Sequence, residues 1–419
     1  MHSNHTPHYE GKGPDMSTQL RQLPSNRMQR VGESRVSLDR ILRETTWNAD
    51  RKAPDACDFF TGDPQEDPIP GYVETLQAYT APESRDWFGY TFDLPAAREA
   101  AAASLAAHTG VPFDAAGIML TNGAFGALAA CVKAVTDPGD EAIIILPPFH
   151  LYDPLCIDAG LSVARVWMNR ETFDLDVDAI AAAITERTRI VFINTPHNPT
   201  GKIYPPETLE RLARLLDDAS TRNGRRIYII SDEVLNRIVF DGIQFHTPAE
   251  FYPNTLLCYS YGKTLLAPGE RVGYIAMPPT MPDRGSVAAS VDTARTVSGY
   301  LHPNTVLQRA LPELEKLSID VANLQRKRDR LVGALKEIGY HVLTPEGTFY
   351  LTPRSPWEDD WAFAGLLATH KIYTWPGQVV GLPGHFRISL TATEDMIERS
   401  IPGFEAAFKH ARENPPEQA

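Results

Sequence analysis

The chain has 419 residues, 43% of them hydrophobic and 22% charged, so it exceeds what one hydrophobic core usually fills and is expected to form two or three domains. Its formal net charge of −13 repels phosphate backbones and anionic membrane surfaces, which argues against a nucleic-acid partner. The four cysteines form no CxxC pair and no apolar run reaches the roughly 18 residues of a membrane span, so we expect a cytoplasmic protein without disulfides, a zinc site or a membrane helix.

The first 30 residues are polar and rich in residues that break regular structure, which is typical of a flexible tail. His2, His5 and His8 lie within this tail. They could bind a metal ion, but histidines in a flexible segment are more often incidental, and we expect no metal site.

From about residue 117 onward the chain contains short, nearly continuous apolar runs, at 142–146, 189–194, 227–232, 256–260 and 272–277. Runs of this length suit strands that are buried on both faces of a sheet. Between two of them, the segment PPETLERLARLL begins with two prolines and spaces its leucines along one helical face. This alternation predicts an α/β fold with a parallel or mostly parallel sheet covered by helices.

The last quarter of the chain has a different pattern. Residues 312–338 carry apolar side chains at helical spacing and stop at Gly339, which predicts one long amphipathic helix with a glycine cap. The segments 347–351 and 385–390 follow. Their strand-like patterns predict a smaller C-terminal α+β domain.

Polar residues gather at the ends of four apolar runs. PPFHLYDP follows Leu146, TPHNPTG follows Asn194, the third run ends at Asp232, and YGKTLLAPGERVGY follows Ser260. In open α/β sheets, ligands bind beyond the carboxyl ends of the strands. We therefore expect these four segments to meet at one site.

The motifs NTPHNPTG, SDEV, SYGKTLLAPGERVGY and FRIS occur in this order. Together they resemble the ordered motifs of the class I and II aminotransferases, across roughly residues 55 to 410. TNGAFGAL and PPFHLYDP are similar to segments of the kynurenine and aromatic aminotransferase-like branch. The resemblance implies a homodimeric enzyme of fold type I that uses pyridoxal 5′-phosphate (PLP).

The same resemblance implies a division of the chain into domains. Residues 1–30 would be the flexible tail, and residues 31–84 would contribute to the small domain. Residues 85–300 would form the large PLP-binding domain, with a mostly parallel sheet of the seven-stranded type. Residues 301–419 would complete the small α+β domain.

Lys263 matches the family's Schiff-base lysine, because a primary amine forms an imine with the cofactor aldehyde and later carries a proton. A solvated surface lysine is the alternative, but the Pro268-Gly269 turn and Arg271 that follow favour the functional reading. Asp232 ends an apolar run, where an unpaired carboxylate would be costly. By resemblance it pairs with the pyridinium nitrogen, whereas a capping or salt-bridge aspartate is the alternative.

The resemblance assigns the cofactor phosphate to Arg271, Ser260 and the turn at Gly123, Ala124 and Phe125. A guanidinium offers a planar fork to phosphate oxygens, a hydroxyl adds one donor, and a turn that opens a helix presents free amides. Gly-rich turns are more often only structural. Many relatives have a second serine where this chain has Gly262, so one phosphate contact could be absent.

Four further residues match family positions. The resemblance places Asn198 against the cofactor's phenolic oxygen, although an Asn-Pro pair can simply be a turn. Phe149 would stack on the pyridine ring, although an aromatic after a strand is often a core residue. Arg387 would bind the substrate α-carboxylate bidentately. Gly62 would lie near the same carboxylate, where a side chain would obstruct binding, and a turn glycine is the alternative.

Three positions depart from the pattern or match it loosely. Relatives usually carry a tyrosine where this chain has Leu235, so the cofactor's phenolic oxygen would lose a donor. Tyr90 resembles a tyrosine that reaches the neighbouring subunit's phosphate, and Phe88 competes with it for that position. A second arginine for a dicarboxylate substrate is not evident; Arg295 is a candidate, and a solvated helix charge is the alternative.

The resemblance implies transamination, in which an amino acid donates its amino group to the cofactor and a 2-oxo acid then takes it away. A lyase, cyclase or oxidase of the same fold remains an alternative, because these motifs do not separate the reactions. A PLP-binding transcription regulator would need a DNA-binding domain ahead of residue 60, where the chain has only a short tail. A dehydrogenase is disfavoured because no apolar run is followed by GxGxxG.

Overall fold

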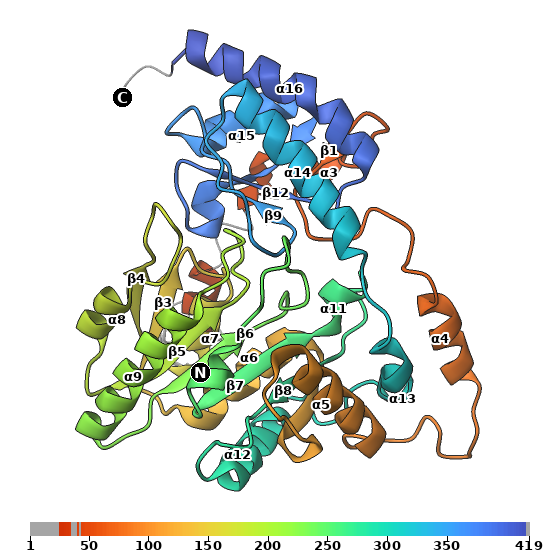
Figure 1. The fold of residues 1–419 in the computed structure, drawn as a ribbon, viewed down its shortest axis with the longest axis vertical. Coiled ribbons are helices and arrows are strands. Elements are labelled where there is room, and N and C mark those ends of the chain that lie inside the picture. Colours follow the sequence, from red (N-terminus) through yellow and green to blue (C-terminus); the bar gives the residue numbers. More distant parts are fainter. Residues whose placement is uncertain (1–24, 35–39, 42, 416–419) are drawn as a thin grey trace, which may run out of the picture.

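A seven-stranded sheet forms the centre of the computed structural model, which describes residues 25–34, 40–41 and 43–415 (Figure 1). The strand order is β2-β8-β7-β6-β5-β3-β4. The strands are β2 (Ile118–Thr121), β3 (Glu141–Leu146), β4 (Ser162–Trp167), β5 (Thr188–Asn194), β6 (Tyr228–Asp232), β7 (Thr255–Ser260) and β8 (Gly273–Ala276). Only β8 runs antiparallel to its neighbours, and all other pairs are parallel. The mostly parallel sheet is confirmed.

Helices cover both faces of this sheet because its strands are apolar on both sides. One face packs against α6 (Gly123–Val135), α7 (Tyr152–Ala159) and α12 (Arg284–Val297). The other packs against α9 (Pro206–Asn223), α8 (Val177–Ala183) and α5 (Pro95–Thr109). Successive residues of one strand serve the two layers: Ile144 belongs to the first core and Ile143 to the second.

A smaller group of elements lies above the sheet in Figure 1, coloured blue. Its strands β11 (Trp375–Pro376), β12 (Phe386–Ser389) and β9 (Tyr350–Leu351) form an antiparallel sheet. Helices α14 (Val321–Ile338), α15 (Asp360–Thr369) and α16 (Glu394–Glu413) pack around it. The N-terminal segment joins this group, because β1 (Cys57–Asp58) pairs in parallel with β10 (Ile372–Tyr373).

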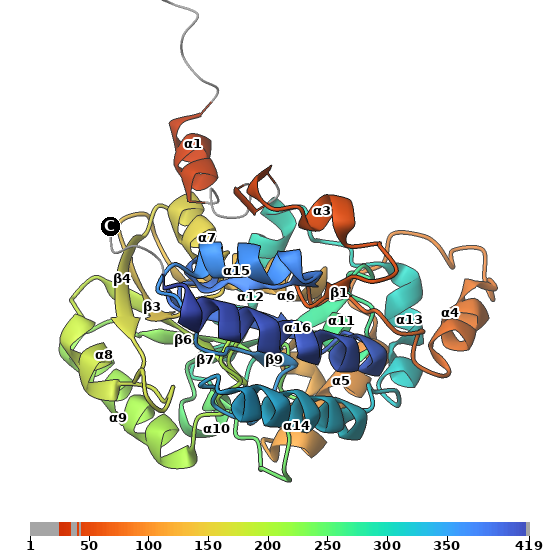
Figure 2. The ribbon, with the colours of Figure 1, turned by 90° about the horizontal axis from the view of Figure 1, so that it is seen from above.

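The remaining elements are short or connect these groups. They are α1 (Asn26–Glu33), α3 (Trp47–Asp50), α4 (Tyr72–Thr80), η1 (Ala115–Gly117), α10 (Pro248–Phe251), α11 (Tyr261–Thr264), α13 (Thr305–Leu314) and η2 (Gly377–Val380). Seen from above, α1 projects from the body next to α7, and α14 and α16 run across the top (Figure 2). Among the described residues, no helix has both the length and the apolar character that a membrane crossing requires.

The single long helix predicted over residues 312–338 is wrong. The structure has two helices there, α13 and α14, and Asp320 caps the second by accepting a hydrogen bond from the Asn323 amide at 2.9 Å. Leu314 packs in the core beside α5, whereas Leu324 packs in the core of the smaller group. Helical spacing of apolar residues cannot show that the apolar face changes its core. The predicted glycine cap at Gly339 is confirmed.

The flexible tail over residues 1–30 stays a prediction; its last described residues begin helix α1, Asn26–Glu33, where the Ser25 side chain accepts a hydrogen bond from the Met28 backbone N–H. Residues 1–24, with His2, His5 and His8, lie outside the described residues. The domain boundaries at 30, 84 and 300 stay a prediction. All four cysteines are buried and free.

Candidate active site

A cavity of about 280 Å³ lies beyond the carboxyl ends of β5, β6 and β7, below the smaller sheet. Every residue predicted to bind a cofactor or substrate lines it, except Gly123. The four polar strand ends therefore meet, as the rule for open α/β sheets predicts. The cavity also holds residues that the sequence did not single out, among them Thr61, His150, Tyr350 and Trp375.

Lys263 is presented by a tight turn after β7. Ser260 caps the short helix α11 by accepting a hydrogen bond from the Gly262 amide at 3.3 Å. The Lys263 ammonium nitrogen lies 5.4 Å from the centre of the Phe349 ring, and no ion pair to it exists among the described residues. A lysine held without a carboxylate partner inside a cavity is available for chemistry.

Close packing explains why position 262 is a glycine. A Cβ atom at this position would lie 2.8 Å from the Cα atom of Pro268, which is closer than real contacts allow. The serine that many relatives have here would require the turn to move. The glycine at position 262, where many relatives have serine, therefore fits the close packing of this turn against Pro268.

Asp232 ends β6 and is buried. Its Oδ2 atom accepts a hydrogen bond from the Tyr152 hydroxyl at 2.8 Å, while Oδ1 is buried without a partner. Burial raises the pKa of this carboxyl to about 6, against the lowering effect of the Tyr152 bond and of Lys263. An unpaired buried oxygen of this kind calls for a proton donor or a cation. A protonated ring nitrogen would satisfy it.

Two asparagines connect the ends of the central strands. The Asn194 side-chain amide donates a hydrogen bond to the Asp232 backbone carbonyl at 2.8 Å. The Asn194 side-chain oxygen accepts a hydrogen bond from the Asn198 backbone N–H at 2.7 Å. Asn194 therefore places Asn198 relative to Asp232. The sequence showed Asn198 through its motif, but it gave no reason to single out Asn194.

Arg387 lies on β12 in a buried position without a carboxylate among the described residues. Its guanidinium is held between the rings of Tyr350 and Trp375, each centred 4.3 Å away. The guanidinium also donates two long hydrogen bonds, each of 3.3 Å, to the Asn198 side-chain oxygen and the Phe60 carbonyl. Burial lowers the pKa of this guanidinium. A cation so placed lacks its anion, and a carboxylate entering the cavity would supply it.

Arg271 and the start of α6 form an anion cradle at one side of the cavity. Gly123 begins the helix at a φ of 76°, and its N-cap residue Asn122 makes no side-chain cap bond, so the first amides are free. A Cβ atom on Gly123 would collide with the Arg271 guanidinium. Ala124, Phe125 and Ser260 line the adjoining wall. Free amides beside an arginine suit a phosphate group.

Gly62 lies against the catalytic side of the cavity. A Cβ atom there would stand 2.5 Å from the Tyr350 hydroxyl and 3.3 Å from the Lys263 nitrogen. Its φ is not positive, so the glycine is needed for space and not for a turn. Phe149 lines the cavity as well and meets Tyr152 edge-on.

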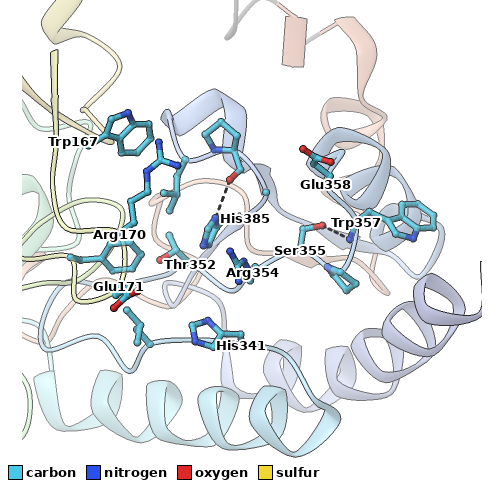
Figure 3. Close-up of a pocket in the computed structure, with 16 residues that line it drawn as sticks. Trp167, Arg170, Glu171, His341, Thr352, Arg354, Ser355, Trp357, Glu358 and His385 are labelled. Atoms are coloured by element: carbon cyan, nitrogen blue, oxygen red, sulfur yellow. Dashed lines mark hydrogen bonds between the residues drawn. The ribbon is translucent and has the colours of Figure 1, made fainter. Parts of the chain in front are cut away.

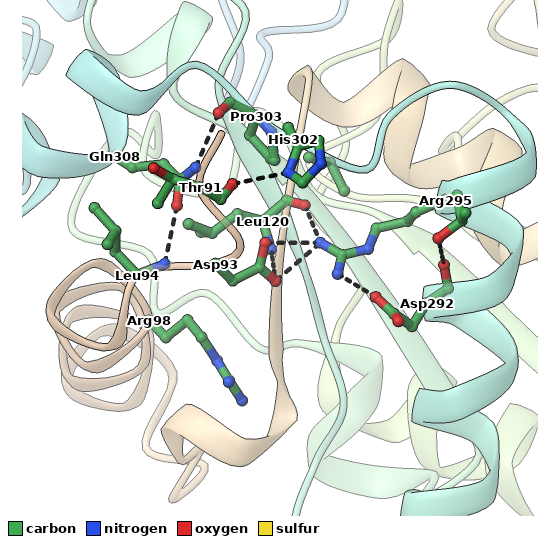
Figure 4. Close-up of polar contacts among 12 residues, drawn as sticks. Thr91, Asp93, Leu94, Arg98, Leu120, Asp292, Arg295, His302, Pro303 and Gln308 are labelled. Atoms are coloured by element: carbon green, nitrogen blue, oxygen red, sulfur yellow. Dashed lines mark hydrogen bonds and ion pairs between the residues drawn. The ribbon is translucent and has the colours of Figure 1, made fainter. Parts of the chain in front are cut away.

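The loosely matched positions fall elsewhere. Tyr90 and Phe88 are exposed, by 94% and 61%, and lie outside the cavity. Arg295 is neither solvated nor directed into the cavity (Figure 4). It is buried between Asp93 at 2.9 Å and Asp292 at 2.6 Å, and it donates to the Leu120 carbonyl. Its charge is used to join α12 to β2.

Leu235 is buried and lines the cavity, so a tyrosine hydroxyl is absent at this position. Tyr152 could have supplied a similar donor, but its hydroxyl is engaged by Asp232. The Tyr350 hydroxyl lies on the Lys263 side, next to Gly62. The leucine therefore extends the apolar part of the wall that Val234 also forms.

Known proteins resemble this chain in sequence and in fold. Residues 54–402 match the family model of aminotransferase class I and II. The chain is 28% identical to the aspartate/prephenate aminotransferase of Thermus thermophilus, over 84% of this chain and 91% of that protein. It is 30% identical to the aspartate aminotransferase of Thermotoga maritima, over 68% and 73%. The crystal structure of an amino transferase from Eubacterium rectale matches with a TM-score of 0.81 at 32% identity, over 95% and 99%.

These matches confirm the fold type I architecture. The kynurenine and aromatic branch is not confirmed, because the relatives above carry the names of aspartate and aspartate/prephenate aminotransferases. They do not support the lyase, cyclase or oxidase alternative.

Proposed function

Because the chain belongs to the class I and II aminotransferase family and so moves an amino group between an amino acid and a 2-oxo acid, we propose that it does so with PLP, using Lys263 as its catalytic amine. The observation that carries the proposal is the charge arrangement of one cavity. Among the described residues, this cavity contains a buried cation without an anion, Arg387, and a buried carboxylate oxygen without a partner, on Asp232. Lys263 lines the same cavity.

The residues present fit the cofactor. Asp232 would hold the protonated ring nitrogen with its unpaired Oδ1 atom, and Tyr152 holds the other oxygen. Arg271, with the amides that begin α6, would hold the phosphate. Asn198 would contact the phenolic oxygen, and the Phe149 ring would cover one face. When bound, PLP supplies an electron sink for the pair released at the substrate Cα atom.

Lys263 would then move the proton. Its amine would hold the cofactor in the resting enzyme, and as a free amine it would take the proton from the substrate Cα atom and carry it. The short helix α11 and the neighbouring Phe349 ring keep the amine inside the cavity. No carboxylate competes for it among the described residues.

Arg387 would bind the substrate α-carboxylate, with Tyr350 and Trp375 fixing the plane of its guanidinium. Arg387→Ala is expected to raise the KM for an amino acid about 10- to 150-fold, since a charge-assisted contact contributes about 1.5–3 kcal/mol. Trp375→Leu should raise it less, because a cation–π contact contributes about 0.5–2 kcal/mol. Steady-state kinetics with an amino acid and with a matched amine that has no carboxylate provide the measurement. An equal loss with the amine would remove Arg387 from this role.

The Leu235 position is tested by returning the hydroxyl. In the Leu235→Tyr variant a new donor to the phenolic oxygen should lower the midpoint pH of the visible-absorbance titration of the holoenzyme. The expected shift is about one unit for a charge-assisted hydrogen bond of about 1.5 kcal/mol. Tyr350→Phe is the companion variant, because the Tyr350 hydroxyl lies on the Lys263 side of the cavity, next to Gly62. An unshifted Leu235→Tyr midpoint beside a raised Tyr350→Phe midpoint would assign the donor to Tyr350.

A homodimer is part of the same proposal. Phe88, Tyr90 and Phe92 are exposed aromatic side chains in the segment before α5. Exposed aromatic side chains so close together in the sequence are typical of a surface that a partner covers. A second copy of the chain is the partner that we propose. The four free cysteines support a cytoplasmic location.

The division into domains also stays a proposal. Helix α13 packs against α4 and α5, on the large sheet's side of the molecule. We place the second boundary of the small domain in the 315–320 segment, between α13 and α14, instead of at residue 300.

A further inference from the structure

A second cavity has a volume of about 990 Å³, and Figure 3 draws the side chains that line it. One wall is the segment 167–173, which begins at the last residue of β4 in the large sheet. The opposite wall comes from three segments of the smaller group of elements, 341–343, 352–358 and 382–385. None of its lining residues also lines the active-site cavity. The cavity therefore sits across the junction of the two parts of the fold.

Basic side chains reach this cavity from both walls. Arg170 comes from the large sheet's side, and His341, Arg354 and His385 come from the other. Among the described residues, neither arginine forms an ion pair or donates a side-chain hydrogen bond. The Arg170 guanidinium instead lies over the ring of Trp167, 3.9 Å from its centre. Stacking fixes the plane of the guanidinium and leaves its N–H edge free for a ligand.

The pKa of His385 is lowered by its surroundings. Burial is the largest cause that lowers its pKa, and the charges that lower it further are Arg354, His341 and Arg170. Its own hydrogen-bond partner is the Pro383 carbonyl, at 3.2 Å. The groups that act on this ring are therefore basic ones from both walls, and they would attract an anion.

Two carboxylates also line the cavity, Glu171 and Glu358. Neither forms an ion pair with the four basic side chains or with any other described residue. Figure 3 draws them toward opposite sides of the pocket, with His385 and Arg354 between them. They leave the cationic groups uncompensated and limit where along the cavity an anion can lie.

We propose that this cavity is a second ligand site, for a small anion with two or more carboxylate or phosphate groups that bridges Arg170 and Arg354. Each arginine can grip one such group bidentately, and the histidines add donors between them. Trp167 and Phe173 supply an apolar wall for the ligand's carbon skeleton. An anion with a single charged group would reach only one wall.

The site is connected to the candidate active site through the chain itself. His385 lies two residues before Arg387, and Arg354 pairs with His385 through an isolated bridge. The same segment packs on the loop that carries Phe149, because a Cβ atom on Gly381 would lie 2.6 Å from Pro148. A ligand that ties the two walls together should therefore change the KM for the amino acid. Only this consequence rests on the proposed function.

The test is equilibrium binding of citrate and, separately, inorganic pyrophosphate to the holoenzyme, followed by calorimetry and tryptophan fluorescence. We expect saturable binding at one site per chain by at least one of the two. Arg170→Gln and Arg354→Gln should each weaken it about tenfold or more. The matched control is Arg222→Gln, which changes an exposed arginine at the end of α9, outside both cavities. It should leave binding unchanged.

The affinities for citrate and pyrophosphate show whether the arginines prefer carboxylate or phosphate groups. The anion that binds more tightly carries the preferred group. Arg387→Ala separates this cavity from the active site, and binding should survive that substitution. Absence of saturable binding by both anions would overturn the proposal. So would binding that Arg387→Ala abolishes while Arg170→Gln and Arg354→Gln leave it intact. Covalent attachment of the cofactor at Lys263 is measured independently, so failure here does not touch the proposed function.

Discussion

A Lys263→Ala variant is expected to lose transamination activity by at least about 10²–10⁴-fold, the range that a positioned acid–base group contributes. Among the described residues that line the cavity, Lys263 is the only one with an amine. Its removal would take away both the proposed covalent attachment of the cofactor and the proposed proton carrier. The measurement is single-turnover absorbance of the holoenzyme mixed with an amino acid.

Two variants control this result. Lys263→Arg keeps the positive charge in the cavity but has no amine that can attach to the cofactor, so it should be as inactive as the alanine variant. Lys133→Ala changes a lysine on α6 that does not line the cavity and should remain active. Activity within tenfold of wild type in Lys263→Arg would show that charge and not amine chemistry is required.

Asp232→Asn is expected to lower the rate by roughly 10²–10³-fold. The carboxylate would face a positively charged ring nitrogen in a buried site, and a loss of about 3–4 kcal/mol, at the lower end of the cost of removing one partner of a buried pair, corresponds to this change in rate. Asparagine retains the shape and can still accept from Tyr152, so a loss reports the charge. A variant with unchanged kcat would show that the ring nitrogen does not depend on this residue.

The same substitution should stabilise the protein when the cofactor is absent. Burial raises the pKa of Asp232 from 3.8 to about 6, so the folded chain holds the proton more tightly than the unfolded chain. Ionising this carboxyl therefore costs stability progressively as the pH rises from about 4 to 6, by about 3 kcal/mol in all. The cofactor-free Asp232→Asn variant should unfold at a higher temperature than wild type at pH 8 and at a similar temperature at pH 4. The opposite order at pH 8 would contradict an unpaired buried charge.

Part of the site could be predicted because its residues belong to strand ends. Lys263, Asp232 and Asn198 each follow an apolar run, and parallel strands bring such ends to one edge of a sheet. The contacts that hold these residues could not be predicted. Tyr152 reaches Asp232 from a helix eighty positions earlier in the chain, and only tertiary packing shows that pairing.

The contacts around Arg387 also depend on tertiary packing. Its motif identified the residue, but the flanking rings of Tyr350 and Trp375 come from two other strands of the smaller sheet. Short strands of two residues carry little pattern of their own. Gly62 illustrates a further limit, because the space it leaves for Tyr350 is visible only once the two segments are placed together.

The most direct test of the central claim is to trap the cofactor on the enzyme. Borohydride reduction of the PLP-loaded wild-type protein, followed by proteolysis and mass spectrometry of the peptides, identifies the attached lysine. The account predicts the reduced cofactor on the peptide that contains Lys263, and on no other lysine. Attachment at a different lysine, or no attachment at all, would contradict it.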